Sequence, residues 1–400
     1  MTRKILFISD HGDPLIPLGS SQAGGQNNYV KHLALSLDAL GFEVHVATHW
    51  SNEAAQEIEH FGERSIVYRF TGGEKGFVPK DEMFELLPTF YRQMCATLAI
   101  EEYEVVHTHY WLSGVLALML QQQHSIYWVH TNHSLAIAKA KGTGERNIQR
   151  EHFEKTIMEK ADVVLATTPN EKELITQFTK GKSDVSVVPI GVAPTFLTPS
   201  SSTMSLPSSY YLYVGRLEES KGIYDLFEAF RELTAEDDEI QLLIAGGCEK
   251  TVNLTTYQPI TKKLQRAIRG IEHRVVFLGP QNEQQLKELY SAALATVMPS
   301  HYESFGMVAA EAQACGCPVI ATSVGGLQDI VQKGRTGLHT PKESAKKLAA
   351  RMRQLLANRH YVAFMGRQAR NFAQREFNWK RIAKQVQQLY KGARYVSTIK

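Results

Sequence analysis

The residues of this 400-residue chain that are best suited to bind a charged ligand are two cations and two glutamates. Arg216 and Lys221 flank a predicted turn from a strand to a helix in VGRLEESKGI. An arginine can fork onto two oxygens and a lysine acts as a point charge, so this pair suits a diphosphate better than a chance pair of surface cations. Glu303 and Glu311 lie eight residues apart, one before a predicted helix and one within it.

The elements around the two glutamates form a predicted strand–loop–helix–strand unit. ATVMPS (295–300) is typical of a buried parallel strand, Met307–Ala314 of a helix, and PVIATS (318–323) of the next strand. Backbone N–H groups and the positive end of the helix then meet at the carboxyl edge of the strands, where open α/β sheets bind anionic ligands. Two glutamates at this spacing alone, however, fit a solvated helix better than a binding site.

Length and composition indicate an ordinary globular protein of two domains. The chain is 43% apolar and 21% charged, and its net charge of +3 is too balanced to indicate a nucleic-acid partner. The start, MTRKILFISD, has no signal-peptide pattern, and the longest apolar helical run, Trp111–Leu120, is too short to span a bilayer. A cytoplasmic protein is expected, with packed thiols at its four cysteines, Cys95, Cys248, Cys315 and Cys317.

Strands and helices alternate along both halves of the chain, which predicts two doubly wound α/β domains with parallel sheets. The first strand, Lys4–Asp10, leads into a glycine-rich loop at Gly19–Gly25 and then a helix. A helix is also predicted from Asp81 to Ile100. The expected domains are 1–193 and 210–376, joined by a Pro/Ser-rich linker at 194–209 and followed by an amphipathic helix within 377–400.

The word ESFGMVAAEAQACGCPVIAT, which contains both glutamates, resembles the signature of family-4 retaining glycosyltransferases of the GT-B fold. GGQNNYV (Gly24–Val30) resembles a loop of sucrose-phosphate synthases and of the inositol-phosphate N-acetylglucosaminyltransferases of mycothiol synthesis. HTHYWLSG (107–114) is similar to a word of the latter enzymes. The resemblance covers nearly the whole chain. It implies two Rossmann-like domains that face each other across a cleft, with the C-terminal helix crossing back onto the first domain.

The resemblance also implies which residues bind the donor. In the family the first glutamate contacts hydroxyls of the donor sugar, the second holds the ribose, and the matching Arg and Lys stabilise the leaving diphosphate. Relatives hold the base through backbone groups near Gly279–Glu283. The donor-binding residues implied for this chain are Gly24, Gly25, Arg216, Lys221, Glu303, Phe305, Gly306, Met307, Val308 and Glu311.

The acceptor residues are also implied by resemblance. His133 matches a histidine that lies beside the acceptor hydroxyl and the donor sugar. The positions that grip a phosphorylated acceptor in the inositol-phosphate enzymes are matched here by Asn27, Lys80, Tyr110, Ser134 and Arg150. Ser134 stands where a threonine is usual, and Lys75 is an alternative to Lys80 because the surrounding loop differs in length.

Metal chemistry is not expected. His107, His109 and Tyr110 end or follow the strand Val105–His109, but alternating strand residues face opposite ways and no acidic or cysteine partner completes a ligand set. A metal-chelating Asp-x-Asp motif is absent, and Asp237-Asp238 fits surface charge in a loop. Arg216, Lys221 and backbone amides are then expected to stabilise the negative charge of the leaving diphosphate.

The expected reaction is metal-independent transfer, with retention, of a hexosyl unit of the glucose or N-acetylglucosamine type from a nucleotide diphosphate sugar, UDP being the first choice. The catalytic residues implied are His133, Arg216, Lys221 and Glu303, without a cofactor, and the family's front-face route applies by resemblance. The acceptor is a small hydroxyl compound, with a phosphorylated cyclitol or sugar as first choice.

Several alternatives stay open at this point. A neutral glycan, an aminocyclitol or a lipid-linked compound could be the acceptor. A phosphorylase, a sugar-nucleotide epimerase or a non-catalytic nucleotide-sugar-binding protein could use the same frame. The basic tail from Arg375 onwards favours a solvated helix face, so membrane contact is at most peripheral, and a homodimer is not excluded.

Overall fold

The computed structural model describes residues 3–16, 24–200, 204–235 and 239–393. Asp237 and Asp238, as well as residues 19–23 of the glycine-rich loop, lie outside these ranges. The chain forms two compact units. Unit 1 consists of Met1–Ala140, Glu145–Gly191 and Trp379–Lys400, and unit 2 consists of Lys141–Gly144 and Val192–Asn378.

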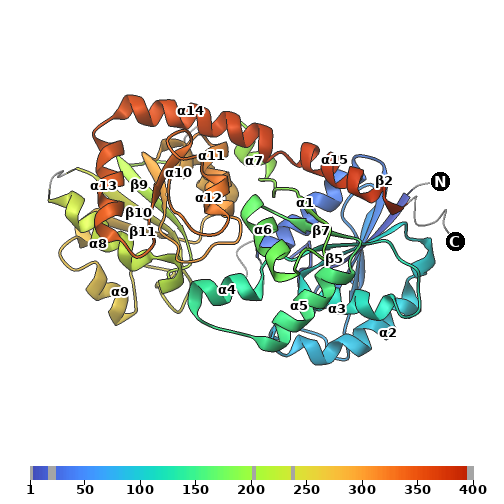
Figure 1. Ribbon diagram of the computed structural model, residues 1–400. Helices are drawn as coiled ribbons and strands as arrows, with labels where there is room; N and C mark the ends of the chain where they lie inside the picture. Colours follow the sequence, from blue (N-terminus) through green and yellow to red (C-terminus); the bar gives the residue numbers. More distant parts are fainter. Residues whose placement is uncertain (1–2, 17–23, 201–203, 236–238, 394–400) are drawn as a thin grey trace. The chain divides into compact units, whose positions relative to one another are not determined.

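Unit 1 is built on an eight-stranded sheet in the order β3-β4-β2-β1-β5-β6-β7-β8 (Figure 1). The strands are β1 (Arg3–Ile8), β2 (Phe42–His49), β3 (Ile58–His60), β4 (Ser65–Phe70), β5 (Val105–His109), β6 (Trp128–Thr131), β7 (Val163–Ala166) and β8 (Val185–Val187). All neighbours pair in parallel except β3 and β4. The sequence does not predict β3, because this edge strand is short and its Ile58 is exposed, so it carries no buried apolar run.

Helices cover both faces of this sheet. They are α1 (Gly25–Asp38), α2 (Leu87–Thr97), α3 (Tyr110–Leu120), α4 (Ala136–Thr143), α5 (Ile148–Lys160), α6 (Pro169–Phe178) and α15 (Trp379–Tyr390). Residues of α2 and α3 pack with Leu6 and Ile8 of β1 on one face. On the other face, where Phe7 and His107 lie, α1 and α15 contribute Tyr29 and Tyr390.

The helix predicted from Asp81 to Ile100 is shorter in the structure. A 3-10 turn, η1 (Met83–Leu86), comes first, and α2 begins only at Leu87. Pro88 explains the difference, because a proline lacks the N–H that an interior helical position must donate and is tolerated in a first turn. Another 3-10 turn, η2 (Ile100–Glu102), then leads to β5.

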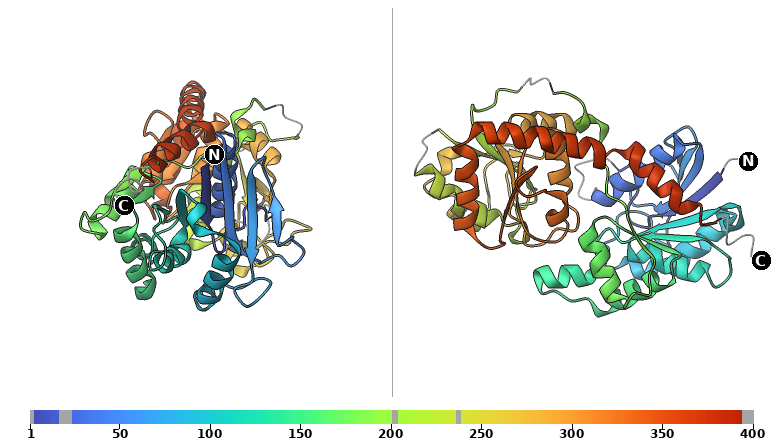
Figure 2. Two further views of the ribbon diagram at one scale, coloured as in Figure 1. Left: turned by 90° about the vertical axis from the view of Figure 1, so that its right-hand side faces the viewer. Right: turned by 45° about the horizontal axis from the view of Figure 1, so that its top comes forward.

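Unit 2 is built on a parallel six-stranded sheet in the order β11-β10-β9-β12-β13-β14. Its strands are β9 (Tyr210–Gly215), β10 (Gln241–Gly246), β11 (Val275–Gly279), β12 (Ala295–Met298), β13 (Val319–Thr322) and β14 (Gly337–Thr340). Its helices and 3-10 turns are α7 (Pro194–Leu197), η3 (Glu219–Lys221), α8 (Ile223–Thr234), α9 (Lys262–Ala267), η4 (Glu272–Arg274), α10 (Glu283–Ala292), α11 (Met307–Ala314), α12 (Leu327–Ile330), α13 (Ala345–Leu356) and α14 (Arg359–Glu376). Figure 2 shows the strands and helices of each unit from two other directions.

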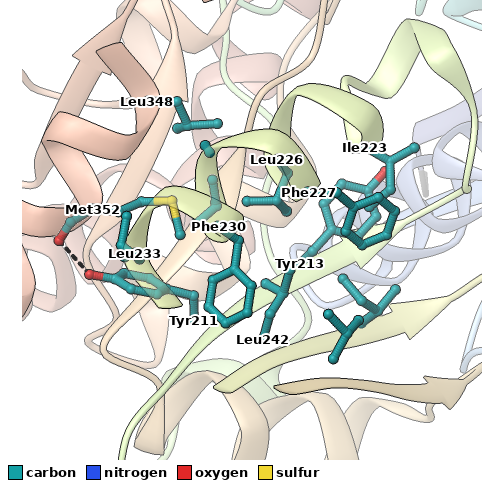
Figure 3. Packing of buried hydrophobic residues seen from close by; sticks show 14 of the residues in the cluster. Tyr211, Tyr213, Ile223, Leu226, Phe227, Phe230, Leu233, Leu242, Leu348 and Met352 are labelled. Carbon is teal, nitrogen blue, oxygen red and sulfur yellow. Dashed lines mark hydrogen bonds between the residues drawn. The ribbon is translucent and has the colours of Figure 1, made fainter. Parts of the chain in front are cut away.

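The core of unit 2 holds helix α8 against the sheet (Figure 3). Apolar residues recur along α8 at helical spacing and are fully or almost fully buried: Ile223, Leu226, Phe227, Phe230 and Leu233. Tyr211 of β9 also lies in this core, and its hydroxyl donates to the Met352 carbonyl oxygen of α13. Packing of α8 therefore fixes the position of the segment that precedes it, which carries Lys221.

The segment 194–209, expected to be a linker, is partly structured. Helix α7 forms at its start, and Phe196 is buried with its ring 6.0 Å from that of Tyr290 in α10. Composition alone does not reveal this contact, because a single aromatic residue is enough to dock a short helix. No helix within the described ranges is long and apolar enough to cross a membrane.

Candidate functional site

Lys221 and Glu303, the first pair of expected donor residues, form an ion pair in unit 2. Nζ of Lys221 lies 2.7 Å from Oε2 of Glu303, and the two side chains are 24% and 18% exposed. Two loops are brought together to make this pair. The His301 N–H donates to the Ser220 carbonyl, and a Cβ on Gly222 (φ +67°) would lie 2.0 Å from the Pro299 carbonyl oxygen, so only glycine fits there.

Arg216, the second expected cation, lies directly after β9 and is 72% exposed. Its guanidinium pairs with Glu218 at 2.9 Å, rather than joining the Lys221–Glu303 pair. An exposed ion pair of this kind is weak, so the side chain can change rotamer at low cost. The structure therefore brings Lys221 and Glu303 together and leaves Arg216 on the adjoining surface.

The N-terminus of α11 has the geometry of an anion site. Gly306 is its N-cap residue, with φ +101°, and no side chain caps the first turn. The N–H groups of Met307 and Val308 belong to this first turn, where a helix has no partners of its own for them. The Phe305 side chain is buried, with its ring 5.8 Å from that of Phe377, so this residue can offer a ligand only its backbone.

Glu311 lies farther along α11 and is half-buried. The Tyr290 hydroxyl donates to its Oε2 at 3.1 Å. Burial raises the pKa of Glu311 to about 7, although the Tyr290 hydrogen bond opposes this effect. The carboxyl group therefore changes its charge within the physiological pH range.

Glu311→Gln is expected to change the pH dependence of stability. Between about pH 4.5 and 7 the folded chain holds more protons at Glu311 than the unfolded chain, because its pKa is raised on folding. Wild-type stability from this group is thus lost as the pH rises toward 7. The unfolding free energy of Glu311→Gln relative to wild type should increase by about 1–3 kcal/mol between pH 5 and pH 8.

Urea denaturation at both pH values measures this difference. Glu249→Gln is a matched control, because Glu249 lies on an exposed loop of the same unit. The control should show no such increase. A difference between Glu311→Gln and wild type that stays the same at both pH values would contradict the raised pKa.

In unit 1, two expected acceptor residues have strained backbones. Tyr110 has φ +77° and His133 has φ +59°, values that residues other than glycine rarely adopt. Both follow the carboxyl ends of neighbouring strands, since His109 of β5 pairs with Thr131 of β6. Such conformations persist where surrounding contacts impose them, and they are concentrated at functional sites.

Arg150, Ser134 and Tyr110 meet at this edge of the sheet. The Arg150 guanidinium lies 4.7 Å from the centre of the Tyr110 ring, and its Nη2 donates to the Ser134 carbonyl oxygen at 2.6 Å and Oγ at 3.2 Å. Its Nε donates to the buried Glu154 carboxylate at 2.6 Å, which fixes the guanidinium in place. The structure thus unites three residues that the sequence places on separate segments.

Lys80, rather than Lys75, approaches this group. Nζ of Lys80 lies 5.7 Å from the centre of the Tyr110 ring, whereas Nζ of Lys75 lies 3.8 Å from that of the Trp50 ring. A cation within about 6 Å of an aromatic face is attracted to it. Tyr110 is therefore contacted by two cationic side chains, Lys80 and Arg150.

His133 is half-buried and lies next to two buried histidines, His107 and His109. Its Nε2 lies 3.1 Å from Nδ1 of His109, and the rings of His109 and His107 have their centres 4.3 Å apart. Burial lowers the pKa of His133 to about 3, so its imidazole is neutral at physiological pH. The sequence led us to expect that the histidines of β5 point to opposite faces of the sheet. This expectation is wrong for His107 and His109, because residues two apart in a strand lie on the same face.

The histidines of this group make their contacts within the protein. Among the described residues, no cluster of three or more His, Cys, Asp or Glu side chains is arranged to hold a metal ion. Both ring nitrogens of His107 have hydrogen-bond partners: Nδ1 lies 2.7 Å from the Tyr390 hydroxyl, and Nε2 lies 2.8 Å from Thr131 Oγ1.

Asn27 uses its side chain within the protein. Its Oδ1 accepts from the Gly24 N–H at 3.0 Å, and its Nδ2 donates to the Asp13 carbonyl oxygen at 2.9 Å. It is buried, whereas Gly24 and Gly25 are exposed at the start of α1. Asn27 therefore caps α1 and ties this helix to Asp13, while the glycines keep their backbone accessible.

Sequence reasoning missed His11, whose ring centre lies 4.6 Å from that of Tyr110. His11 and Asp10 follow β1, and β1 pairs with β5. The sequence did contain a signal for His11, because the polar pair Asp10-His11 comes shortly after a buried strand, as Tyr110 does. Only the strand order shows that these two strand ends are neighbours.

Comparison with known families gives two matches. Residues 23–196 match the model described as "Glycosyltransferase Family 4". Residues 201–372 match the model described as "Glycosyl transferases group 1". Between them the two matches span most of both units.

Individual relatives match over almost the full chain. D-inositol 3-phosphate glycosyltransferase of Corynebacterium aurimucosum is 33% identical, covering 98% of this chain and 96% of the relative. The enzyme of the same name from an Arthrobacter species is 32% identical with the same coverage. The solved structure of sucrose-phosphate synthase from Thermosynechococcus elongatus is 33% identical, with a TM-score of 0.87 and 98% of each chain covered.

A more distant structure shares the fold. Anabaena HepE in complex with UDP-glucose has a TM-score of 0.70 at 18% identity, covering 97% of this chain and 99% of that chain. At this identity the likeness concerns the fold alone. Two Rossmann-like units with parallel sheets, as predicted from the sequence, are thereby confirmed.

Proposed function

Because the chain belongs to the family-4 glycosyltransferases of the GT-B fold, we propose that it transfers a hexosyl unit from a nucleotide diphosphate sugar to a small phosphorylated acceptor. The observation that carries the acceptor class is the pair of cations, Lys80 and Arg150, around Tyr110. A phosphate monoester is the ligand that such cations and hydroxyl donors suit best. The names of the D-inositol 3-phosphate glycosyltransferases and of the sucrose-phosphate synthase support the same class.

Unit 2 would bind the donor, with UDP as the first candidate for its nucleotide. Lys221, Arg216 and the first-turn N–H groups of α11 supply positive charge toward the diphosphate, whose negative charge grows as the glycosidic bond breaks. Lys221 then exchanges its contact with Glu303 for a phosphate oxygen. Glu303, once released, accepts hydrogen bonds from the sugar hydroxyls.

Unit 1 would bind the acceptor. The neutral His133 suits a hydrogen bond to a sugar or acceptor hydroxyl, and it is a poor base because its pKa is about 3. The acceptor proton is therefore assigned to the departing phosphate oxygen, which is the front-face route with retention. Asn27 contributes indirectly, by holding the start of α1 and the exposed backbone of Gly24 and Gly25.

A donor panel tests the function. The purified chain is incubated with UDP-glucose, UDP-N-acetylglucosamine and their ADP and GDP counterparts, with and without D-inositol 3-phosphate, and products are identified by mass spectrometry. A new glycoside that forms equally well in EDTA is expected. A sugar phosphate would indicate a phosphorylase, an isomerised nucleotide sugar an epimerase, and loss with EDTA that Mg²⁺ restores would contradict metal independence.

Arg150→Ala is expected to weaken binding of the phosphorylated acceptor by about 10- to 150-fold, because a charge-assisted hydrogen bond contributes roughly 1.5–3 kcal/mol. The effect should fall on the KM for D-inositol 3-phosphate, while the affinity for UDP stays unchanged. Arg146→Ala is the matched control, since Arg146 precedes the same helix and is 66% exposed. An equally small effect of both substitutions would contradict the acceptor assignment.

A further inference from the structure

His301 lies in the loop that carries Glu303, between β12 and α11, and it has no part in the proposed chemistry. Its side chain is 16% exposed, and its Nε2 lies 2.8 Å from Oδ2 of Asp225. Asp225 belongs to the first turn of α8. The loop that carries Glu303 is therefore joined to α8 by a largely buried contact between two side chains.

A second carboxylate faces the other nitrogen of this imidazole. Nδ1 of His301 lies 3.7 Å from Oε1 of Glu343, which comes just before α13. Glu343 has φ +54°, a strained value that persists in residues other than glycine only where surrounding contacts impose it. A protonated imidazole donates from both nitrogens, so His301 can hold both carboxylates at once. Three segments of unit 2 thus meet at His301.

These contacts lie beside the ion pair of Lys221 and Glu303. The His301 N–H donates to the carbonyl of Ser220, the residue next to Lys221, and Glu303 lies two residues after His301. Asp225 lies four residues after Lys221, at the start of the helix that is packed against the sheet. His301 therefore joins the segment of Lys221 to the segment of Glu303 through its backbone and through its side chain.

The side-chain contact matters most when the donor is bound. In the proposed function Lys221 exchanges Glu303 for a phosphate oxygen, so the ion pair no longer holds the two segments together. The contact between His301 and Asp225 uses neither Lys221 nor Glu303 and is therefore kept. Glu303 then depends on this contact for its position at the moment when it accepts hydrogen bonds from the sugar.

We propose, resting on the proposed function, that His301 is a positioning residue that keeps Glu303 aligned with the donor sugar after Lys221 has moved to the diphosphate. Asp225 and Glu343 hold its imidazole from two sides. His301 acts through Glu303 and not on the substrate itself. Its loss should slow turnover of a nucleotide sugar but leave binding of UDP unchanged, because UDP has no sugar for Glu303 to contact.

Steady-state kinetics and titration with UDP on the full chain test this role. His301→Ala should lower kcat for the nucleotide sugar identified by the donor panel by about 10- to 100-fold, since a misplacement of about 1 Å can cost about 100-fold in rate. Its affinity for UDP should equal that of wild type. His301→Gln keeps a donor for Asp225 and should recover most of the lost kcat.

His273→Ala is the matched control. His273 is exposed on η4 of the same unit, so this variant should equal wild type in kcat and in affinity for UDP. A loss of kcat in His273→Ala as large as that in His301→Ala would overturn the role of His301, because the effect would then not depend on the contact with Asp225.

Asp225→Ala removes the partner of the imidazole and gives a second test. Its kcat should fall as that of His301→Ala does, and the double variant His301→Ala/Asp225→Ala should be no slower than the slower single variant. Substitutions are non-additive in this way when the two residues act through one contact. Losses that multiply in the double variant would overturn the role, because the two side chains would then act separately.

The outcomes separate this role from the proposed function. A near-normal kcat of folded His301→Ala overturns the role of His301 and leaves the proposed function intact. Equal losses of kcat and of UDP affinity also overturn it, because the whole donor site would then be disturbed. If His301→Ala does not fold, Asp225→Ala decides, since a near-normal kcat of that variant overturns the role. If wild type turns over no nucleotide sugar, the proposed function fails and the role of His301 fails with it.

Discussion

Lys221→Ala is expected to reduce kcat by about 100-fold or more, which is the effect of removing one preorganised charge-stabilising donor. The loss should fall on kcat rather than on KM, because the negative charge of the leaving diphosphate grows in the transition state. The substitution also removes Nζ of Lys221, which lies 2.7 Å from Oε2 of Glu303, so the Glu303 carboxylate loses its cationic partner. Steady-state kinetics with the donor identified by the panel measures the change.

Two comparisons isolate the role of Lys221 in catalysis. Lys263→Ala is the matched control, because Lys263 is 60% exposed and pairs at 2.7 Å with Glu219 of the same segment, η3. The double variant Lys221→Ala/Glu303→Gln removes the unpaired carboxylate together with a proposed contact to the donor sugar, so its kcat should not exceed that of Lys221→Ala. If Lys221→Ala retains a near-normal kcat while folded, Lys221 has no part in the mechanism.

Arg69→Ala is expected to lower the free energy of unfolding by about 3–5 kcal/mol, because it leaves a buried carboxylate without its cation. Arg69 and Asp13 have side chains that are each 1% exposed, with Nε 2.6 Å from Oδ2. The Asp13 carbonyl also accepts the hydrogen bond from Asn27. Loss of Arg69 should therefore weaken the contact between Asp13 and Asn27 as well as destabilise unit 1.

Chemical denaturation measures this stability. Arg92→Ala is the control, since Arg92 is exposed on α2 and bonds to Pro88 and Thr89 nearby, and it should change stability by less than about 0.5 kcal/mol. Arg69→Met/Asp13→Asn should recover part of the loss, because it removes both charges. Equal stability of Arg69→Ala and Arg92→Ala would show that the buried pair contributes nothing.

The sequence by itself determined the order and type of most elements around the donor site. Helix α11 begins at Met307 and ends at Ala314, as predicted, because Gly306 and Gly316 bound a run of helix-forming residues. The strands β12 and β13 lie within their predicted apolar runs, since strands covered on both faces need no polar alternation. These features depend on residues close together in the chain, so a local pattern is enough to predict them.

Only the tertiary structure decided which side chains meet. Asp10 bonds to Ser113, 103 residues away, because β1 and β5 are neighbours in the sheet. Arg69 pairs with Asp13 because β4 lies beside β2 and β2 beside β1. The strand order cannot be predicted from a local sequence pattern, because it depends on which faces of the strands and helices are buried against one another. His11 therefore reads as an ordinary loop residue in the sequence, and only folding brings it against Tyr110.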